Sequence, residues 1–259
     1  SKSDGSIIQI SRSDVNIDDK TITISVGAGA GTNCSLITTL DKKSVKSKEK
    51  KFNSVGDLTI SRSKYSSING LQESSVYGTR IEDDTISLNC ADVYRVYGIY
   101  ESKTSDDPAL PSIKLTDITG TSGTDQDFVE GETIQSVFGT AKAIVIKRKS
   151  DNVLEIQYIN GEKFLSGESI LSATSSITAK IESLTVGDDD IFGNYYFDNG
   201  IRSEFYDYSR IIKSDSRFEP KRKIRVIYQK YSVDPSNKGD FFSANSYSPE
   251  LYQSIPFTS

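Results

Sequence analysis

Apolar and polar residues alternate in short runs along most of this chain. In "VLEIQYI", Leu154, Ile156 and Tyr158 alternate with Glu155 and Gln157. The same period of two recurs in "TITISV", "DLTIS", "TISLNC" and "KIRVIYQ", and the runs end at Gly, Asn, Asp or Ser. This period is typical of β-strands that bury one face, whereas helical spacing is almost absent. The pattern therefore predicts an all-β protein built from β-sandwich-like domains.

One motif occurs twice, as "FVEGETI" from residue 128 and "FLSGESI" from residue 164. A glycine at its centre fits a tight turn with positive φ, and the flanking Phe and Ile would share one apolar surface. Each copy precedes a strand-like run containing Thr-Ala-Lys, at residues 140–142 and 178–180. Since neither half buries enough alone, we predict that they cover each other in a small β-barrel or roll. The structural residues of the repeat are Phe128, Gly131, Glu132, Ile134, Phe164, Gly167, Glu168 and Ile170.

The repeated glutamates, Glu132 and Glu168, also admit a chemical interpretation. Paired carboxylates can perform acid–base catalysis or bind Ca²⁺. Equivalent residues of a pseudo-symmetric module, however, tend to lie at equivalent corners and do not face each other. The acidic "DDD" at residues 188–190 could hold Ca²⁺, but it lacks the 12-residue calcium-loop pattern. We therefore predict no catalytic residues, no metal site and no cofactor site.

Polar segments rich in Pro or Gly divide the chain. They are "SKTSDDPALPS" (102–112), "TDITGTSGTDQD" (116–127) and "TVGDDDIFGN" (185–194). We predict an N-terminal β domain over 1–115, a duplicated small β module over 116–187 and a C-terminal β segment over 188–259. The last segment either completes the sheet of the first domain or forms a domain of its own. We favour the first, because residues 86–100 and 223–231 both have the pattern of long interior strands.

The amino-acid composition excludes several classes of catalytic and metal site. The 259 residues include no His, Trp or Met. Without His, a Ser-His-Asp or Cys-His nucleophile and a His-based zinc site are impossible within the chain. Without an initiator Met, we expect a segment of a longer polypeptide. The two cysteines, Cys34 and Cys90, are predicted to be buried, reduced thiols.

Charge and hydropathy argue against nucleic-acid binding and membrane insertion. The net charge is −5, and the densest basic run, "KSVKSKEKK", contains no aromatic residue for base stacking. We predict instead a solvated strand or hairpin whose lysines protect a sheet edge. No run reaches the roughly 18 apolar residues that a transmembrane helix requires.

The C-terminal part is rich in aromatic residues. "FDNG" (197–200) predicts a turn at Asn199-Gly200, across which Arg202 and Asp207 could pair. "GDFFSANSYS" combines aromatic and small polar residues, as adaptable contact surfaces do. Three interpretations stay open: a loop packed on its own sheet, an inter-subunit contact and a sugar-binding surface. The candidate partner contacts are Tyr206, Tyr208, Phe241, Phe242 and Tyr247.

Several of these motifs occur in a recognisable order. "ADVYRVYGIYES" is followed by a proline-containing segment and the repeat, then by "YYFDNGIRSEFYDYSRIIK", "KIRVIYQKYSV", "GDFFSANSYS" and "YQSIP". This order resembles modular virion proteins of large contractile-tailed bacteriophages, such as those that infect marine cyanobacteria. The resemblance covers residues 85–259.

The resemblance implies a place in the virion and no reaction. We expect a structural, non-enzymatic component of the phage tail, in the baseplate or tail-fibre region, assembled in the cytoplasm of the bacterial host. Its partners would be other tail, baseplate or fibre proteins, and copies of itself in a trimer or hexameric array. One alternative is a receptor- or glycan-binding adhesin module. Another is a polysaccharide-degrading enzyme that uses carboxylates.

Overall fold

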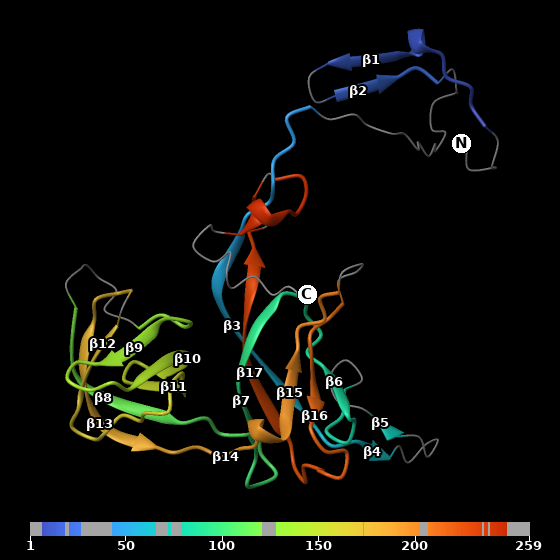
Figure 1. The fold of residues 1–259 in the computed structure, drawn as a ribbon. Helices are drawn as coiled ribbons and strands as arrows, with labels where there is room; N and C mark the ends of the chain where they lie inside the picture. The colour runs from blue at the N-terminus through green and yellow to red at the C-terminus, as the bar shows by residue number, and fades with distance from the viewer. Residues whose placement is uncertain are drawn as a thin grey trace. The chain divides into compact units, whose positions relative to one another are not determined.

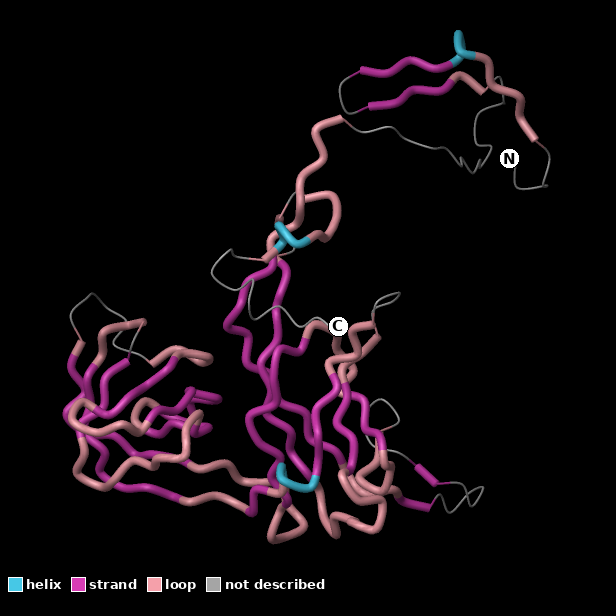
Figure 2. The backbone as a smooth tube through the Cα atoms, in the orientation of Figure 1, coloured by secondary structure: helices cyan, strands magenta, loops and turns pink. Residues whose placement is uncertain are grey.

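The computed structural model describes residues 7–18, 21–26, 43–65, 72–73, 79–120, 128–172, 174–202, 207–234, 236–237 and 239–247. The chain forms two compact units, Ser1–Val45 and Lys46–Ser259, so the predicted domain over 1–115 spans both. Strands dominate the tube in Figure 2, and the described helical structure is limited to short 3₁₀ turns. The all-β prediction is confirmed. The turns are η1 (Arg12–Asp14), η3 (Phe192–Asn194) and η4 (Ala244–Ser246).

The described part of the N-terminal unit is a short antiparallel hairpin. Strand β1 (Val15–Asp18) pairs with β2 (Thr21–Ile24), and Ile17 lies opposite Ile22. These two side chains are 58% and 44% exposed. A lone hairpin with so little buried surface gains little stability from packing. Cys34 lies outside the described residues.

The larger unit contains a β-sandwich of two antiparallel sheets (Figure 1). In the four-stranded sheet, ordered β14-β7-β17-β3, strand β17 pairs with β7 on one side and β3 on the other. Strands from both sides of the repeat thus share one sheet. A two-stranded hairpin of β4 (Lys64–Tyr65) and β5 (Gln72–Glu73) follows β3. The sandwich strands are β3 (Lys50–Ile60), β7 (Val93–Glu101), β14 (Asp189–Asp190) and β17 (Ile224–Val233) in one sheet, and β15 (Tyr195–Asp198), β16 (Arg210–Lys213) and β6 (Thr85–Ser87) in the other.

Strand β17 departs from strict apolar–polar alternation at Ile227, because both of its faces are covered. Val226 packs against the second sheet, in a cluster with Ile60, Ile99 and Ile211. Its neighbour Ile227 points to the opposite side of the sheet and is also fully buried, in a separate cluster. A central strand that is covered on both faces becomes a continuous apolar run.

The duplicated segment closes into a six-stranded antiparallel barrel, so the predicted small barrel is confirmed. The Phe and Ile of each repeat copy are at most 4% exposed and lie in the barrel core. The barrel begins at Ser112, before the predicted boundary at 116. Its strands are β8 (Ser112–Thr119), β9 (Thr133–Ser136), β10 (Lys142–Ser150), β11 (Val153–Tyr158), β12 (Ser169–Ser172) and β13 (Thr178–Thr185).

The pairing reveals a pseudo-two-fold relation between β8–β10 and β11–β13. Ile134 pairs with Ala143, and the equivalent Ile170 pairs with Ala179. Ile134 and Ile170 are separated by the same number of residues as the starts of the two motifs, at residues 128 and 164. The same separation holds for Ala143 and Ala179. The Thr-Ala-Lys triplets are two residues out of step with this spacing, so they are not equivalent positions. A shift of two retains the inward and outward alternation of a strand, which explains why the triplets still resemble each other.

Candidate functional site

The segment at residues 239–247 lies against the start of β3. The amide of Asp240 donates to the carbonyl of Lys46 at 2.8 Å, and the amide of Lys48 donates to the carbonyl of Phe241 at 2.8 Å. A Cβ atom on Gly239 would lie 2.5 Å from the Cα of Lys48, so this close approach requires glycine. Backbone pairing therefore fixes residues 239–241 beside the chain entering the sandwich.

Lys50 anchors the same segment from beneath. Its Nζ donates to Asp92 Oδ2 at 2.6 Å and to the Tyr247 hydroxyl at 2.9 Å. The same ammonium lies 5.0 Å from the ring centroid of Phe242 and 4.7 Å from that of Tyr247. The Lys50 side chain is 5% exposed, so the predicted solvated lysine run is wrong at this position. It holds for Lys51, which is 66% exposed at the sheet edge.

The predicted contact residues separate into exposed and buried side chains. Phe241 and Phe242 are 44% and 53% exposed, whereas Tyr247 is 6% exposed and packs against Tyr231 in the interior. We call Phe241 and Phe242 the aromatic edge. Tyr208 is 57% exposed but lies between β15 and β16. Tyr206 lies outside the described residues.

Sequence reasoning missed Lys50 and Asp92. Lys50 lies beyond an irregularity in β3, where the strand advances three residues from Ser54 to Lys51 while β17 advances two, so counting in steps of two from the buried Ile60 does not assign its face. Asp92 gives no sequence signal either. It has a φ of 59° in the turn before β7, and only the fold brings it to Lys50.

The repeated glutamates hold the barrel together. Glu132 accepts a hydrogen bond from the amide of Val129 at 2.7 Å, in its own turn, and from the hydroxyl of Ser172, in the other half. Glu168 repeats this arrangement with the amide of Leu165, at 2.9 Å, and the hydroxyl of Ser136. Each carboxylate therefore joins its own turn to the opposite half of the barrel.

The central glycines of the repeat allow these corners to form. Gly131 and Gly167 have φ values of 91° and 84°, as the sequence predicts for both turns. In each turn, the glutamate that follows the glycine accepts from the amide three residues earlier. Equivalent residues thus occupy equivalent corners, and their carboxylates are used in structural hydrogen bonds.

The "FDNG" turn carries a charged network centred on Asp198. Arg202 binds both of its oxygens, at 3.0 and 2.6 Å, and Arg210 Nε donates to Oδ2 at 2.9 Å. The predicted partner of Arg202 is therefore wrong, because Asp207 lies 3.6 Å from Arg210 instead. The hydrogen bond from Arg202, helped by the Gly200 amide and Arg210, holds the pKa of Asp198 well below its usual value.

The barrel meets the sandwich through a buried glutamine. The Gln157 side chain accepts a hydrogen bond from the Tyr100 hydroxyl at 2.8 Å and donates to the carbonyls of Tyr97 and Tyr158 at 3.4 and 3.2 Å. A Cβ atom on Gly98 would lie 3.0 Å from Gln157 Oε1, so glycine lets the barrel approach β7. Burial is the main cause that raises the pKa of Tyr100, which keeps its hydroxyl a donor.

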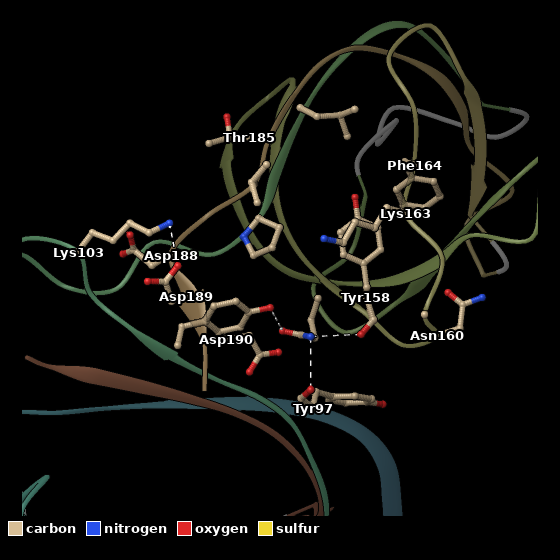
Figure 3. A pocket seen from close by; sticks show the side chains of 16 residues that line it. Tyr97, Lys103, Tyr158, Asn160, Lys163, Phe164, Thr185, Asp188, Asp189 and Asp190 are labelled. Carbon is tan, nitrogen blue, oxygen red and sulfur yellow. Dashed lines mark hydrogen bonds and ion pairs between the residues drawn. The ribbon is translucent and has the colours of Figure 1, made fainter. Parts of the chain in front are cut away.

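An open cleft of about 540 Å³ lies beside this contact. Figure 3 shows Tyr158 and Lys163 on the barrel side, and Lys103 with the three aspartates across from them. Burial raises the pKa of Tyr158, whose ring packs against Phe164 at a centroid distance of 5.6 Å. The cleft therefore combines aromatic rings with charges of both signs.

The three aspartates do not converge on one point. Asp188 accepts from the amide of Ala109 at 2.7 Å, Asp189 pairs with Lys103 at 3.1 Å, and Asp190 accepts from the amide of Phe192 at 3.0 Å. Across the described residues, no three acidic or Cys side chains gather as metal ligands would. The described cysteine, Cys90, is free and partly buried, and burial raises the pKa of its thiol.

Comparison with known proteins gives no family for this chain. It matches no protein-family model, and no curated protein or solved structure was found to be similar to it. In the part of the chain that the structure describes, no helix has the length and apolar character for a membrane crossing.

Proposed function

We propose that this chain is a structural component of a bacteriophage tail, in the baseplate or tail-fibre region, and that it works by protein–protein assembly. The resemblance of residues 85–259 to modular virion proteins supports this role. A rigid β-rich unit is a suitable connector because assembly needs surfaces of fixed shape. Its partners would be other tail proteins and further copies of the chain, as a trimer or hexameric array in the virion.

The observation that carries the proposal is the anchored aromatic edge. Phe241 and Phe242 are exposed, yet backbone bonds to residues 46–48 and the buried Lys50 beneath hold their segment in place. Exposed aromatic side chains that are already ordered lose little conformational entropy on binding, and they are typical energetic centres of interfaces. We therefore assign the aromatic edge as a contact with a neighbouring tail subunit.

The same proposal assigns no catalytic activity to the chain. The repeated carboxylates would be the best candidates for an enzyme that uses two acids. Glu132 and Glu168 instead accept hydrogen bonds from backbone amides and serine hydroxyls of the barrel. Their use in these bonds argues against a role in hydrolysis.

Two experiments test the proposal: detection of the chain in purified virions, and a variant of the aromatic edge. Mass spectrometry of purified particles from a phage that carries the gene should detect this chain in the tail fraction. The variant Phe241→Ser/Phe242→Ser should fold but lower the yield of tailed particles at least tenfold. Tyr196→Ser, which changes a side chain of similar exposure (52%) on β15, is the matched control and should leave the yield unchanged. A chain absent from virions, or equal yields for both variants, would refute the proposal.

A further inference from the structure

The cleft between the barrel and β14 has the dimensions and setting of a ligand site. Its volume of about 540 Å³ falls within the roughly 300–1,000 Å³ of small-molecule pockets, which often lie where two structural modules meet. The buried Gln157, with bonds to Tyr97, Tyr100 and Tyr158, fixes the backbone at its base. The cleft is therefore preformed, so a ligand would not have to organise it.

Opposite charges face each other across the cleft. Asp188, Asp189 and Asp190 line one side, and each uses one carboxylate oxygen in the bonds described above. On the barrel side Lys163 is exposed, and among the described residues no carboxylate pairs with it. Hydrogen-bond acceptors thus remain on one wall, where Lys103 is already bound to Asp189 and to the carbonyl of Gly187, and a strong donor remains on the other.

This arrangement selects among ligand classes. A cationic ligand would meet Lys163, and an anionic ligand would meet the three aspartates. A hydroxyl group both donates and accepts hydrogen bonds, so a neutral ligand with several hydroxyls can satisfy both walls at once. The half-buried rings of Tyr97 and Tyr158 add flat apolar surface beside these polar groups.

We propose that this cleft binds a neutral carbohydrate. The hydroxyls of the sugar donate to the carboxylates of Asp188–190 and accept from Lys163, while its C–H face lies against the tyrosine rings. The site differs from the aromatic edge and does not depend on the proposed assembly role. An open cleft with few polar groups should bind weakly, with Kd of about 0.1–10 mM.

The test uses the full chain, isotope-labelled, and three neutral probes: maltohexaose, cellohexaose and the hexamer of N-acetylglucosamine. At least one probe, at up to about 10 mM, should shift backbone amide signals of residues 158–164 and 184–190. Lys163→Ala should then weaken binding at least threefold. Lys180→Ala, which removes an exposed lysine on β13 away from the cleft, is the matched control and should leave Kd unchanged.

Two charged probes distinguish the alternatives. Spermine and inorganic phosphate should shift these signals less than the active sugar does at equal concentration. The proposal is overturned if no neutral probe shifts the cleft signals, or if the shifts lie elsewhere. It is also overturned if spermine or phosphate binds the cleft more tightly, or if Lys163→Ala binds as well as Lys180→Ala. The spectrum of each variant without ligand reports directly whether it is folded.

Discussion

The barrel and the sandwich are both antiparallel, but they form over very different distances along the chain. All barrel strands lie between Ser112 and Thr185, and an internal repeat supplies both halves. The sandwich pairs Ile60 of β3 with Ile224 of β17, and Lys50 with Val233. A barrel built from two adjacent copies of one motif can be inferred from the sequence. The pairing of strands that are far apart in the chain cannot, because the local pattern of a strand does not identify the strand with which it pairs.

The two regions also use charge differently. In the barrel, two glutamates at equivalent corners accept bonds from amides and hydroxyls. In the sandwich, Lys50 forms a buried ion pair with Asp92, and Asp198 binds two arginines. A symmetric repeat can use the same hydrogen-bond arrangement twice. In a sandwich assembled from distant segments, each contact between segments needs an ion pair or hydrogen bond of its own. Four predictions test this difference.

The largest effect is expected at Lys50. Lys50→Ala leaves Asp92 partly buried without its cation, and loss of one partner of a buried pair typically costs about 3–5 kcal/mol. Lys51→Ala removes the neighbouring exposed lysine and should change the free energy of unfolding by less than about 0.5 kcal/mol. Urea denaturation followed by circular dichroism measures both. Similar values for the two variants would show that the Lys50 junction does not stabilise the sandwich.

The second prediction tests the equivalence of the barrel halves. Ile134 and Ile170 occupy equivalent positions, and both are fully buried. Ile134→Ala and Ile170→Ala should each lower the free energy of unfolding by about 2–5 kcal/mol, and the two values should agree within about 1 kcal/mol. Chemical denaturation of the two variants gives the comparison. A much larger difference would mean that the halves are not energetically equivalent.

The third prediction concerns the glutamate corners. Glu132 is 6% exposed and accepts from Ser172 and from Ser175, the latter at 2.9 Å. Glu132→Ala should therefore cost about 1.5–3 kcal/mol, the usual range for hydrogen bonds to a charged group. Glu168→Ala should cost less, because Glu168 is less buried and binds one serine hydroxyl.

A control and a double-mutant cycle sharpen that result. Glu182→Ala removes an exposed glutamate that pairs with Lys114 and should change stability by less than about 0.5 kcal/mol. Combining Glu132→Ala with Ser172→Ala should be clearly less costly than the sum of the single changes, since both remove the same bond. Additive costs would count against a bond between the two halves.

The smallest effect is a pH dependence in the sandwich. The pKa of Asp198 is lowered in the folded state, so its ionised form stabilises fully above the unfolded pKa of about 3.9. This contribution is lost as the pH falls through the lower, folded pKa. Between pH 6 and pH 2, the wild type should therefore lose more sandwich stability than Asp198→Asn.

The measurement uses isoleucine methyl signals during urea titration at each pH. Ile211 reports on the sandwich and Ile170 on the barrel, because each lies in the core of its own region. The difference between wild type and Asp198→Asn should appear at Ile211. Equal pH dependence of the two proteins at Ile211 would contradict the role of this carboxylate.

The sequence by itself determined the β-class, the barrel and its two glycine turns. Alternation marks which face of a strand is apolar, and the repeated Phe, Gly and Ile identify two halves that must cover each other. These features are local, because each depends on residues that are close in sequence.

Only the tertiary structure decided the rest: that β17 lies between β3 and β7, that Asp92 and Tyr247 meet Lys50, and that a cleft opens beside Gln157. A strand's pattern defines its faces but not its partner, since many strands of similar pattern could pair with it. The choice is made by the sum of long-range contacts when the chain closes. For that reason the sequence could indicate Phe241 and Phe242 as contact residues, but it could not reveal the anchoring of their segment by Lys50 or the cleft, because both lie where distant segments meet.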